Sequence, residues 1–472
     1  MTTRRDVLLS GAALGASLAG CALFGDRSGG RLMEIVAGDK PLLIAARQRD
    51  IALGHVTGVP AWLYSDGSPF PMLRIKRGAM LDVTLQNALA EHTSIHWHGV
   101  RGPNAMDGVP YLTQMPVKPG ETFNYRFVPP DAGTYFFHPH CNTAEQMGRG
   151  LVGALIVEDP QDRFDDDVVM ILKDWRLGEN GGFLPFLTPS GASRAGTFGT
   201  LRTVNGVVGP RIVTRADANI RLRLINADPT RIAQIGIDGA LASIIAIDGN
   251  PVAPLPLDTW RLGPGMRLDL LLCTTQADAR LLDYFAAMPV LLATLAPNGK
   301  SGDVGDASLV QTPLSDFANA TRLALELGAG VDSNTVPDPQ PIVLPDGRVI
   351  DLADSLCLSQ GTFWTLNGKS WPDRDHTKLP PPLFTFKRGE QVVLEIANTT
   401  SRAHPIHIHG HTMVVLSASL LSRPAHRADT VLVLPNERVI VGFVADNPGN
   451  WMIHCHVIEH QETGMMGWFR VS

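Results

Sequence analysis

The sequence predicts an all-β protein built from three Greek-key β-sandwich domains, and three observations support this fold class. First, 46 glycines and 35 prolines separate short runs such as LDVTLQN and QVVLEIANTT, in which apolar and polar residues alternate as in strands joined by turns. Second, 472 residues are more than one hydrophobic core usually organises. Third, the chain contains three related segments, which divide it into domains.

Two of these segments match at fixed spacing. LRIKRGAMLDVTLQNALAEHTSIHWHG (73–99) and FTFKRGEQVVLEIANTTSRAHPIHIHG (384–410) share a Lys-Arg-Gly turn, an alternating strand, an asparagine and a final His-x-His-Gly. The distance from the glycine of the turn to the first histidine is 18 positions in both. GTYFFHPH (133–140) and GNWMIHCH (449–456) form a second matched pair. We infer two copies of one domain.

A third copy, ANIRLRLINADPTRIAQIGIDG, keeps the strand and the asparagine but has Ile235 and Ile237 where histidines would be due. We therefore expect the middle domain to be a spacer and packing partner without metal chemistry. The Gly/Asp/Ser-rich stretch that follows it predicts a long exposed connection. Units of this length with short alternating strands suit Greek-key sandwiches, and the predicted domains span residues 30–160, 161–320 and 335–472.

Residues 1–29 are predicted to be an export signal and no part of the fold. Arg4 and Arg5 precede an apolar stretch of small residues, as in twin-arginine signals, whose machinery exports folded proteins. LAGC (18–21) resembles a lipoprotein processing site, which would place a diacylglyceride on Cys21; simple cleavage is the alternative. We expect a periplasmic protein whose attachment to a membrane, if any, is through Cys21.

Charge and cysteine content exclude two other classes. A net charge of −6 without any basic run leaves no footprint for nucleic acid. Of the five cysteines, Cys21 and Cys455 have other predicted roles, so at most one disulfide can form and the chain is not a disulfide scaffold. Buried free thiols are expected instead.

The histidines are arranged in four His-x-His pairs, each at the end of an apolar strand. Because side chains alternate along a strand, both imidazoles of a pair lie on one face. A single pair is usually a surface or core feature, but four pairs matched between two repeats predict a cluster that holds several metal ions between the first and third domains. Left empty, eight buried imidazoles would be costly. The pairs are His96 and His98, His138 and His140, His407 and His409, and His454 and His456.

The motif HCH (454–456) contains a cysteine whose thiol must face away from its two neighbours. The same alternation turns His404 to that opposite face, and the following loop can bring back His460 and Met465. Two imidazoles, a thiolate and a weak thioether are the ligands of a blue-copper electron-transfer site. Zinc is the alternative for a Cys/His set, but it does not explain the methionine or the eight other histidines.

With these motifs the sequence resembles the multicopper oxidases, in particular the bacterial three-domain laccase-like group. HWHG, HPH, HPIHIHG and HCHVIEHQETGM follow one another in the family's order, and the resemblance extends over essentially the whole mature chain. It implies cupredoxin-like domains and four copper ions. It also implies that four one-electron oxidations are coupled to the four-electron reduction of dioxygen to two waters.

The resemblance implies a ligand set for each ion. The type 1 ion is expected on His404, Cys455 and His460 with axial Met465, the type 2 ion on His96 and His407, and the type 3 pair on His98, His138 and His456 and on His140, His409 and His454. The first domain carries other residues where the third has type 1 ligands, so only the third domain is expected to hold a type 1 ion.

Electrons and protons must both reach the cluster. Cys455 is bonded in sequence to both neighbouring histidines, which predicts a short covalent route for electrons from the type 1 ion. Reduction of dioxygen also requires protons, and Asp107 matches the family's acidic residue eleven positions after His96. Gln461 departs from the glutamate that many bacterial relatives carry there, and glutamine cannot release a proton at neutral pH. Asp107 or Glu462 is expected to take over this role.

The expected activity is a laccase-like oxidation of phenols or similar donors, because an axial methionine favours donors that are easily oxidised. Cuprous-ion or ferrous-ion oxidation is the alternative. A non-enzymatic copper-binding or scaffold relative is a distant third, since such proteins have lost ligands and this chain fills all twelve positions. The expected partners are an electron donor, dioxygen and the twin-arginine machinery.

Overall fold

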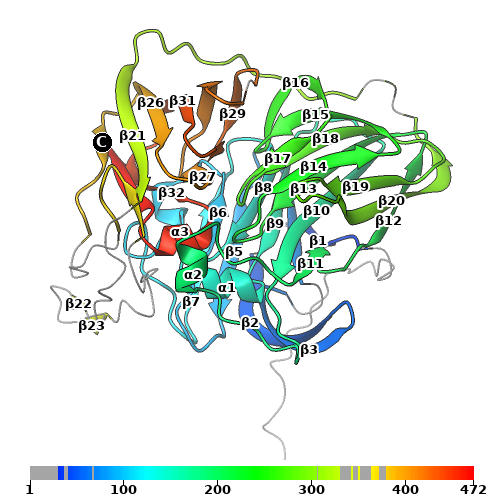
Figure 1. The fold of residues 1–472 in the computed structure, drawn as a ribbon, viewed down its shortest axis with the longest axis horizontal. Coiled ribbons are helices and arrows are strands. Elements are labelled where there is room, and N and C mark those ends of the chain that lie inside the picture. The colour runs from blue at the N-terminus through cyan, green and yellow to red at the C-terminus, as the bar shows by residue number, and fades with distance from the viewer. Residues whose placement is uncertain are drawn as a thin grey trace, which may run out of the picture.

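The computed structural model describes residues 30–36, 41–65, 69–303, 305, 307–329, 342–343, 349–350, 363–371, 379–421 and 423–472. The predicted export signal and Cys21 lie outside these residues. Within the described part, six sheets of four or more strands form three pairs, and short helices lie between strands (Figure 1). The predicted all-β, cupredoxin-like fold class is confirmed. No described helix is long and apolar enough to cross a membrane.

The first pair of sheets has strand orders β1-β4-β9-β8-β6 and β3-β2-β5-β7. In β5, Leu81, Val83 and Leu85 are buried in the sandwich while the residues between them are less so, which is the alternation that the sequence shows. The elements are β1 (Met33–Val36), β2 (Leu42–Leu53), β3 (Val56–Leu63), β4 (Pro71–Lys76), β5 (Leu81–Asn87), β6 (His96–His98), η1 (Asn104–Met106), β7 (Thr122–Phe127), β8 (Gly133–His138), α1 (Thr143–Arg149) and β9 (Gly153–Glu158).

The middle pair has strand orders β11-β10-β13-β18-β15-β16 and β12-β20-β19-β14-β17. Neighbouring strands are often distant in sequence, so connections cross between the sheets. The elements are β10 (Asp166–Trp175), α2 (Pro189–Ala192), β11 (Leu201–Val204), β12 (Arg211–Ala216), β13 (Asn219–Asn226), β14 (Ala233–Asp238), β15 (Leu241–Ile247), β16 (Asn250–Pro256), β17 (Trp260–Leu262), β18 (Arg267–Cys273), β19 (Ala279–Asp283) and β20 (Val290–Ser301).

The third pair has strand orders β24-β21-β26-β31-β28-β29 and β25-β33-β32-β27-β30. Its elements are β21 (Thr321–Ala329), β24 (Trp364–Leu366), β25 (Phe384–Phe386), β26 (Glu390–Asn398), β27 (His404–Ile408), β28 (Met413–Ala418), β29 (His426–Ala428), β30 (Thr430–Val433), β31 (Arg438–Ala445), β32 (Gly449–Cys455), α3 (Ile458–Glu462) and β33 (Met466–Val471). A separate hairpin joins β22 (Ile342–Val343) to β23 (Val349–Ile350).

Two details differ from the sequence-based expectations. The third pair of sheets begins before residue 335, because β21 pairs in parallel with β26 from Thr321 onward. The third domain therefore takes in residues that were expected to lie outside it. Among the described cysteines, Cys141 and Cys455 are buried as expected, but Cys273 is exposed at the end of β18.

Candidate metal centres

Two antiparallel strand pairs bring the predicted histidine pairs together. In the first domain β6 pairs with β8, with His96 opposite His138, and in the third domain β27 pairs with β32, with His407 opposite His454. These four strands come close to one another near the centre of the molecule (Figure 1). Imidazoles from the two domains stack across the joint, with ring centroids 3.9 Å apart for His96 and His409.

All eight imidazoles of the cluster are buried, and the rings of each expected type 3 set lie near one another. Contacts between the sets are at least as close, with 3.7 Å between the ring centroids of His98 and His407. Ring centroids of His98, His138 and His456 lie 4.8–5.8 Å apart. Those of His140, His409 and His454 lie 5.0–5.3 Å apart.

The two imidazoles expected to hold the type 2 ion lie between these groups. The ring centroids of His96 and His407 are 5.7 Å apart. Nitrogens of His96 lie within 4.8 Å of nitrogens in both groups, so this ring is near both.

Backbone carbonyls determine which nitrogen of these rings is available to a metal. Nδ1 of His96 faces the carbonyl oxygen of Asp107 at 2.8 Å, Nδ1 of His138 faces that of Pro139 at 3.0 Å, and Nδ1 of His407 faces that of Asp429 at 3.0 Å. A carbonyl only accepts, so each Nδ1 carries the proton and Nε2 keeps its lone pair. This outer hydrogen bond is the one that metal-binding histidines typically make.

The donor atoms fit a set of metal ions. Within the cluster, the buried nitrogens for which the described residues supply no hydrogen-bond partner are Nε2 of His96, His138, His140 and His407, Nδ1 of His98, and both nitrogens of His456. Nε2 of His409 and Nε2 of His454 face each other at 3.2 Å. So many unpaired lone pairs in one buried place would be costly, and metal ions that accept them remove this cost.

Asp107 lies against the cluster, as the sequence predicts. Its carboxylate is buried, with Oδ2 3.0 Å from Nδ1 of His409 and Oδ1 3.3 Å from Nδ1 of His96. It therefore links an imidazole of the first domain to one of the third. Gly108 next to it has φ +86°, and a Cβ there would lie 1.8 Å from the carbonyl oxygen of Ile95, so only glycine fits this approach.

Glu462 has a contact that sequence reasoning did not foresee. Its Oε1 accepts a hydrogen bond of 2.8 Å from the backbone N–H of Ala144, in the first turn of α1. A carboxylate at this position stabilises the amino end of a helix. Glu462 and Gln461 are both buried within α3. A part for Glu462 in proton delivery remains a prediction.

On the opposite face of β27 and β32, three side chains form the predicted sulfur-containing site. Sγ of Cys455 lies 3.5 Å from Nδ1 of His404 and 3.6 Å from Nδ1 of His460, and the two nitrogens are 3.1 Å apart. A point equidistant from these three atoms is about 2 Å from each, which is the length of metal–imidazole bonds. The three atoms therefore fit one transition-metal ion.

The hydrogen bonds around this site orient its ligand atoms. Nε2 of His404 faces the hydroxyl of Thr400 at 2.8 Å, and Nε2 of His460 faces the carbonyl of Arg194 at 2.6 Å, which leaves Nδ1 of His460 to the metal. Burial raises the pKa of the Cys455 thiol, so a metal ion must displace its proton on binding. Met465 is fully buried in the loop between α3 and β33, and its carbonyl oxygen accepts a hydrogen bond of 3.0 Å from the Cys455 N–H.

A short segment of the middle domain covers the site formed by Cys455, His404 and His460. Besides the contact of Arg194 with His460, the carbonyl of Ala192 in α2 accepts from Nε1 of Trp364 at 2.7 Å. The carboxylate of Glu459 accepts from the hydroxyl of Thr197 at 2.8 Å and so holds this segment against α3. Residues 188–197, called the α2 cover below, therefore separate His460 from solvent.

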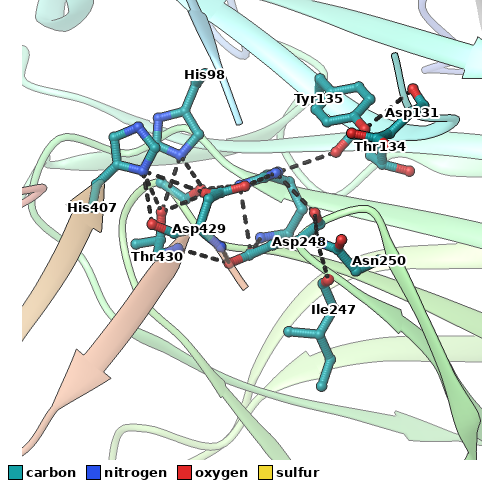
Figure 2. Close-up of polar contacts among 12 residues, drawn as sticks. His98, Asp131, Thr134, Tyr135, Ile247, Asp248, Asn250, His407, Asp429 and Thr430 are labelled. Atoms are coloured by element: carbon teal, nitrogen blue, oxygen red, sulfur yellow. Dashed lines mark hydrogen bonds and ion pairs between the residues drawn. The ribbon is translucent and has the colours of Figure 1, made fainter. Parts of the chain in front are cut away.

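Asp429 and Thr430 are two residues of the cluster that sequence reasoning missed. Oδ1 of Asp429 lies 3.2 Å from Nε2 of His98 and 3.4 Å from Nδ1 of His407, and the Thr430 hydroxyl is 3.1 Å from both rings (Figure 2). Although burial alone would raise it, the Arg267 guanidinium holds the pKa of Asp429 well below its usual range. A carboxylate inside the apolar run ADTVLV was the available signal.

Comparisons with known proteins agree with this site. Models of the multicopper oxidase family match residues 46–162, 167–296 and 355–472. The multicopper oxidase MmcO of Mycobacterium tuberculosis is 28% identical, over 98% of this chain and 95% of that protein.

Two solved structures are also similar. A multi-copper oxidase from Pseudomonas thermotolerans has a TM-score of 0.80 and 35% identity, and covers 93% of this chain and 100% of its own. One from Pseudomonas parafulva has a TM-score of 0.79 and 37% identity, over 92% and 100%.

The fold, the histidine cluster and these similarities define a copper-dependent oxidoreductase that uses dioxygen. The chain belongs to the multicopper oxidase family. The family resemblance drawn from the four histidine motifs is thereby confirmed.

Metal-depleted protein is expected to lose stability as the pH falls from about 7.5 to about 5.5. Burial, and then neighbouring histidines, lower the pKa values of cluster imidazoles such as His98, His138 and His140. Below about pH 6.5 the unfolded chain takes up protons that the folded chain refuses, so each such histidine costs up to about 1.4 kcal/mol per pH unit. Asp248 and Asp174, whose pKa values burial raises to about 7 and about 6, act in the opposite direction but are outnumbered by the buried imidazoles. Thermal unfolding followed by circular dichroism checks this, and a constant or rising Tm would contradict it.

Proposed function

We propose that the chain is a laccase-like multicopper oxidase with one type 1, one type 2 and two type 3 copper ions. The supporting observation is the back-to-back arrangement at β32. The Cys455 sulfur lies within 3.6 Å of the type 1 imidazoles, while the neighbouring His454 and His456 belong to the cluster on the other face. When bound, the copper ions supply one-electron chemistry in which four electrons and four protons reduce one dioxygen to two waters.

The protein groups perform the remaining tasks of this reaction. A donor at the α2 cover would pass its electron to the type 1 site by way of His460, whose N–H donates to the Arg194 carbonyl. From there the electron would reach the cluster through the peptide on either side of Cys455. The α2 cover keeps water from the type 1 ligands. Asp107, in contact with His96 and His409, is the carboxylate best placed to hold or transfer a proton at the cluster.

Phenols and similar small aromatic donors are the proposed substrates. They transfer electrons without binding to a metal, so a donor resting on the α2 cover needs no direct contact with His460. Among curated relatives, Laccase-2 of Botryotinia fuckeliana is 28% identical over 86% of this chain and 77% of its own length. This similarity favours the same class of donor.

A ferrous-ion or cuprous-ion oxidase is the second candidate, because three carboxylates line one hollow beside the α2 cover. Glu459, Asp174 and Asp228 contribute to its wall. Burial and the charge of Asp228 raise the pKa of Asp174 to about 6, and a cation there would relieve this. The iron transport multicopper oxidase FET3 of Gibberella zeae is 26% identical over 85% of this chain and 71% of its own.

Steady-state rates of dioxygen consumption with a phenol, a ferrous and a cuprous donor decide between these functions. We expect the copper-loaded protein to oxidise the phenol at least about tenfold faster in kcat/KM, a difference of about 1.4 kcal/mol in the barrier. Asp174→Asn, which removes charge from the hollow at a residue outside the α2 cover, is expected to leave the phenol rate unchanged. Faster oxidation of a metal ion, slowed by this substitution, would establish the second candidate instead.

Cys455→Ser is expected to abolish the intense blue absorption band and donor oxidation while the cluster keeps its copper. Serine removes the soft sulfur ligand of the type 1 ion without changing the direction of the neighbouring histidine side chains. The protein therefore loses about one ion per chain. Absorption spectroscopy and copper analysis check this. Wild-type turnover in this variant would refute the route through Cys455.

We also propose that residues 1–29 direct export to the periplasm, with a lipid on Cys21. The twin-arginine pair and the LAGC sequence support this. Fractionation of cells that produce the full chain and its Cys21→Ser variant tests both parts. A wild-type protein that stays in the cytoplasm would contradict export, and equal release of both forms from membranes would contradict lipidation.

A further inference from the structure

The middle domain, expected to be a spacer, reaches the cluster at the start of β18, where Gly265 packs against His456 and His98 and a buried arginine follows. Arg267, the first residue of β18, is fully buried and points out of its own domain. Its Nη1 and Nη2 donate to the two carboxylate oxygens of Asp429 at 2.7 and 2.5 Å, and its Nε donates to the carbonyl of Thr134 at 3.1 Å. One guanidinium thus joins a residue of the third domain to one of the first.

Asp429 in turn contacts two histidines that are assigned to different ions. The carboxylate that accepts from Arg267 also lies against His98 of the first domain and His407 of the third. Figure 2 shows the two imidazoles side by side, with Asp429 and Thr430 beneath them and Asp248 to the right of Asp429. An ion pair with two parallel hydrogen bonds fixes both position and orientation of a carboxylate, which a single point charge does not.

Further contacts hold the ion pair of Arg267 and Asp429 in place. Asp248 accepts from the backbone N–H groups of Asp429 and Thr430 at 3.2 and 3.0 Å, and from that of Arg267 at 2.8 Å. A Cβ on Gly99 would lie 2.3 Å from Nη2 of Arg267, so the residue after the HWH motif must be glycine here. These contacts leave the guanidinium and the carboxylate little freedom to move.

We propose that Arg267 is a positioning residue of the copper cluster: by holding Asp429, it sets the ring orientations of His98 and His407 and so the affinity for the type 2 ion and one type 3 ion. This inference rests on the proposed function, because it assumes that the cluster binds copper. It makes the middle domain a working part of the metal centre although that domain contributes no histidine.

A second buried arginine in the same domain supplies a matched control. Arg221 is also buried, and its Nη2 donates to Asp269 at 2.7 Å. Within the described part of the chain, its carboxylate partners Asp269 and Asp162 form no hydrogen bond or ion pair with a cluster histidine. Replacing either arginine by methionine keeps an unbranched apolar stem and removes one buried charge. Loss of stability is therefore common to both variants, and an effect on the cluster is specific to Arg267.

The test compares the copper-loaded full chain with its Arg267→Met, Arg267→Lys, Asp429→Asn and Arg221→Met variants. Copper per chain at fixed free copper, the electron paramagnetic resonance spectrum of the type 2 ion, and the blue band are measured. We expect Arg267→Met to bind cluster copper about 10–100-fold more weakly and to alter the type 2 spectrum, since outer-shell partners carry effects of this size. The blue band per chain stays, and Arg221→Met resembles the wild type.

Arg267→Lys is expected to recover part of the affinity, because it restores the charge but not the two parallel bonds. Wild-type copper affinity and type 2 spectrum in Arg267→Met would overturn the inference. If that variant does not fold, Asp429→Asn decides in the same way: altered cluster copper supports the inference and unchanged copper overturns it. A wild-type protein without any type 2 signal would refute the proposed function itself, so the two failures are distinguishable.

Discussion

The structure depends on the alternation of side chains along β32 at residues 454–456. Within one strand, two imidazoles and one thiol cannot share a face, so the segment must belong to two sites at once. Because β32 pairs with β27, the side chains of β27 are also divided between the two faces, with His407 on the cluster face and His404 on the other. The separation between a site that receives electrons and a site that uses them is thus set by backbone geometry.

Burying eight imidazoles is energetically costly, and the fold reduces this cost with neutral hydrogen-bond acceptors and two carboxylates. Burial lowers the pKa values of cluster imidazoles such as His98, His138 and His140, which favours their neutral form. Carbonyl oxygens fix the protonated nitrogen of several rings, so their lone pairs point inward before any metal arrives. Two carboxylates, Asp107 and Asp429, lie outside the rings, and each contacts one histidine from the first domain and one from the third.

Sequence periodicity was sufficient for the parts of the site that lie on single strands. The His-x-His pairs and the opposed Cys455 follow from a period of two, and the repeats showed which strands would face each other. Arg267 and Asp429 could not be paired in this way, since they are 162 positions apart and belong to different domains. The charged residues inside the apolar runs GMRLDLLL and ADTVLV indicated buried ion pairs, but not their partners. The α2 cover and β21 were missed for the same reason, because only tertiary contacts define their places.

In the proposed arrangement one strand connects two metal centres on its opposite faces. Anomalous diffraction at the copper absorption edge, from crystals of the copper-loaded protein, locates each ion. We expect one peak among Cys455, His404 and His460, and three peaks among the eight imidazoles on the other side of β32. A missing peak beside the sulfur, or copper on only one face of the strand, would refute this arrangement.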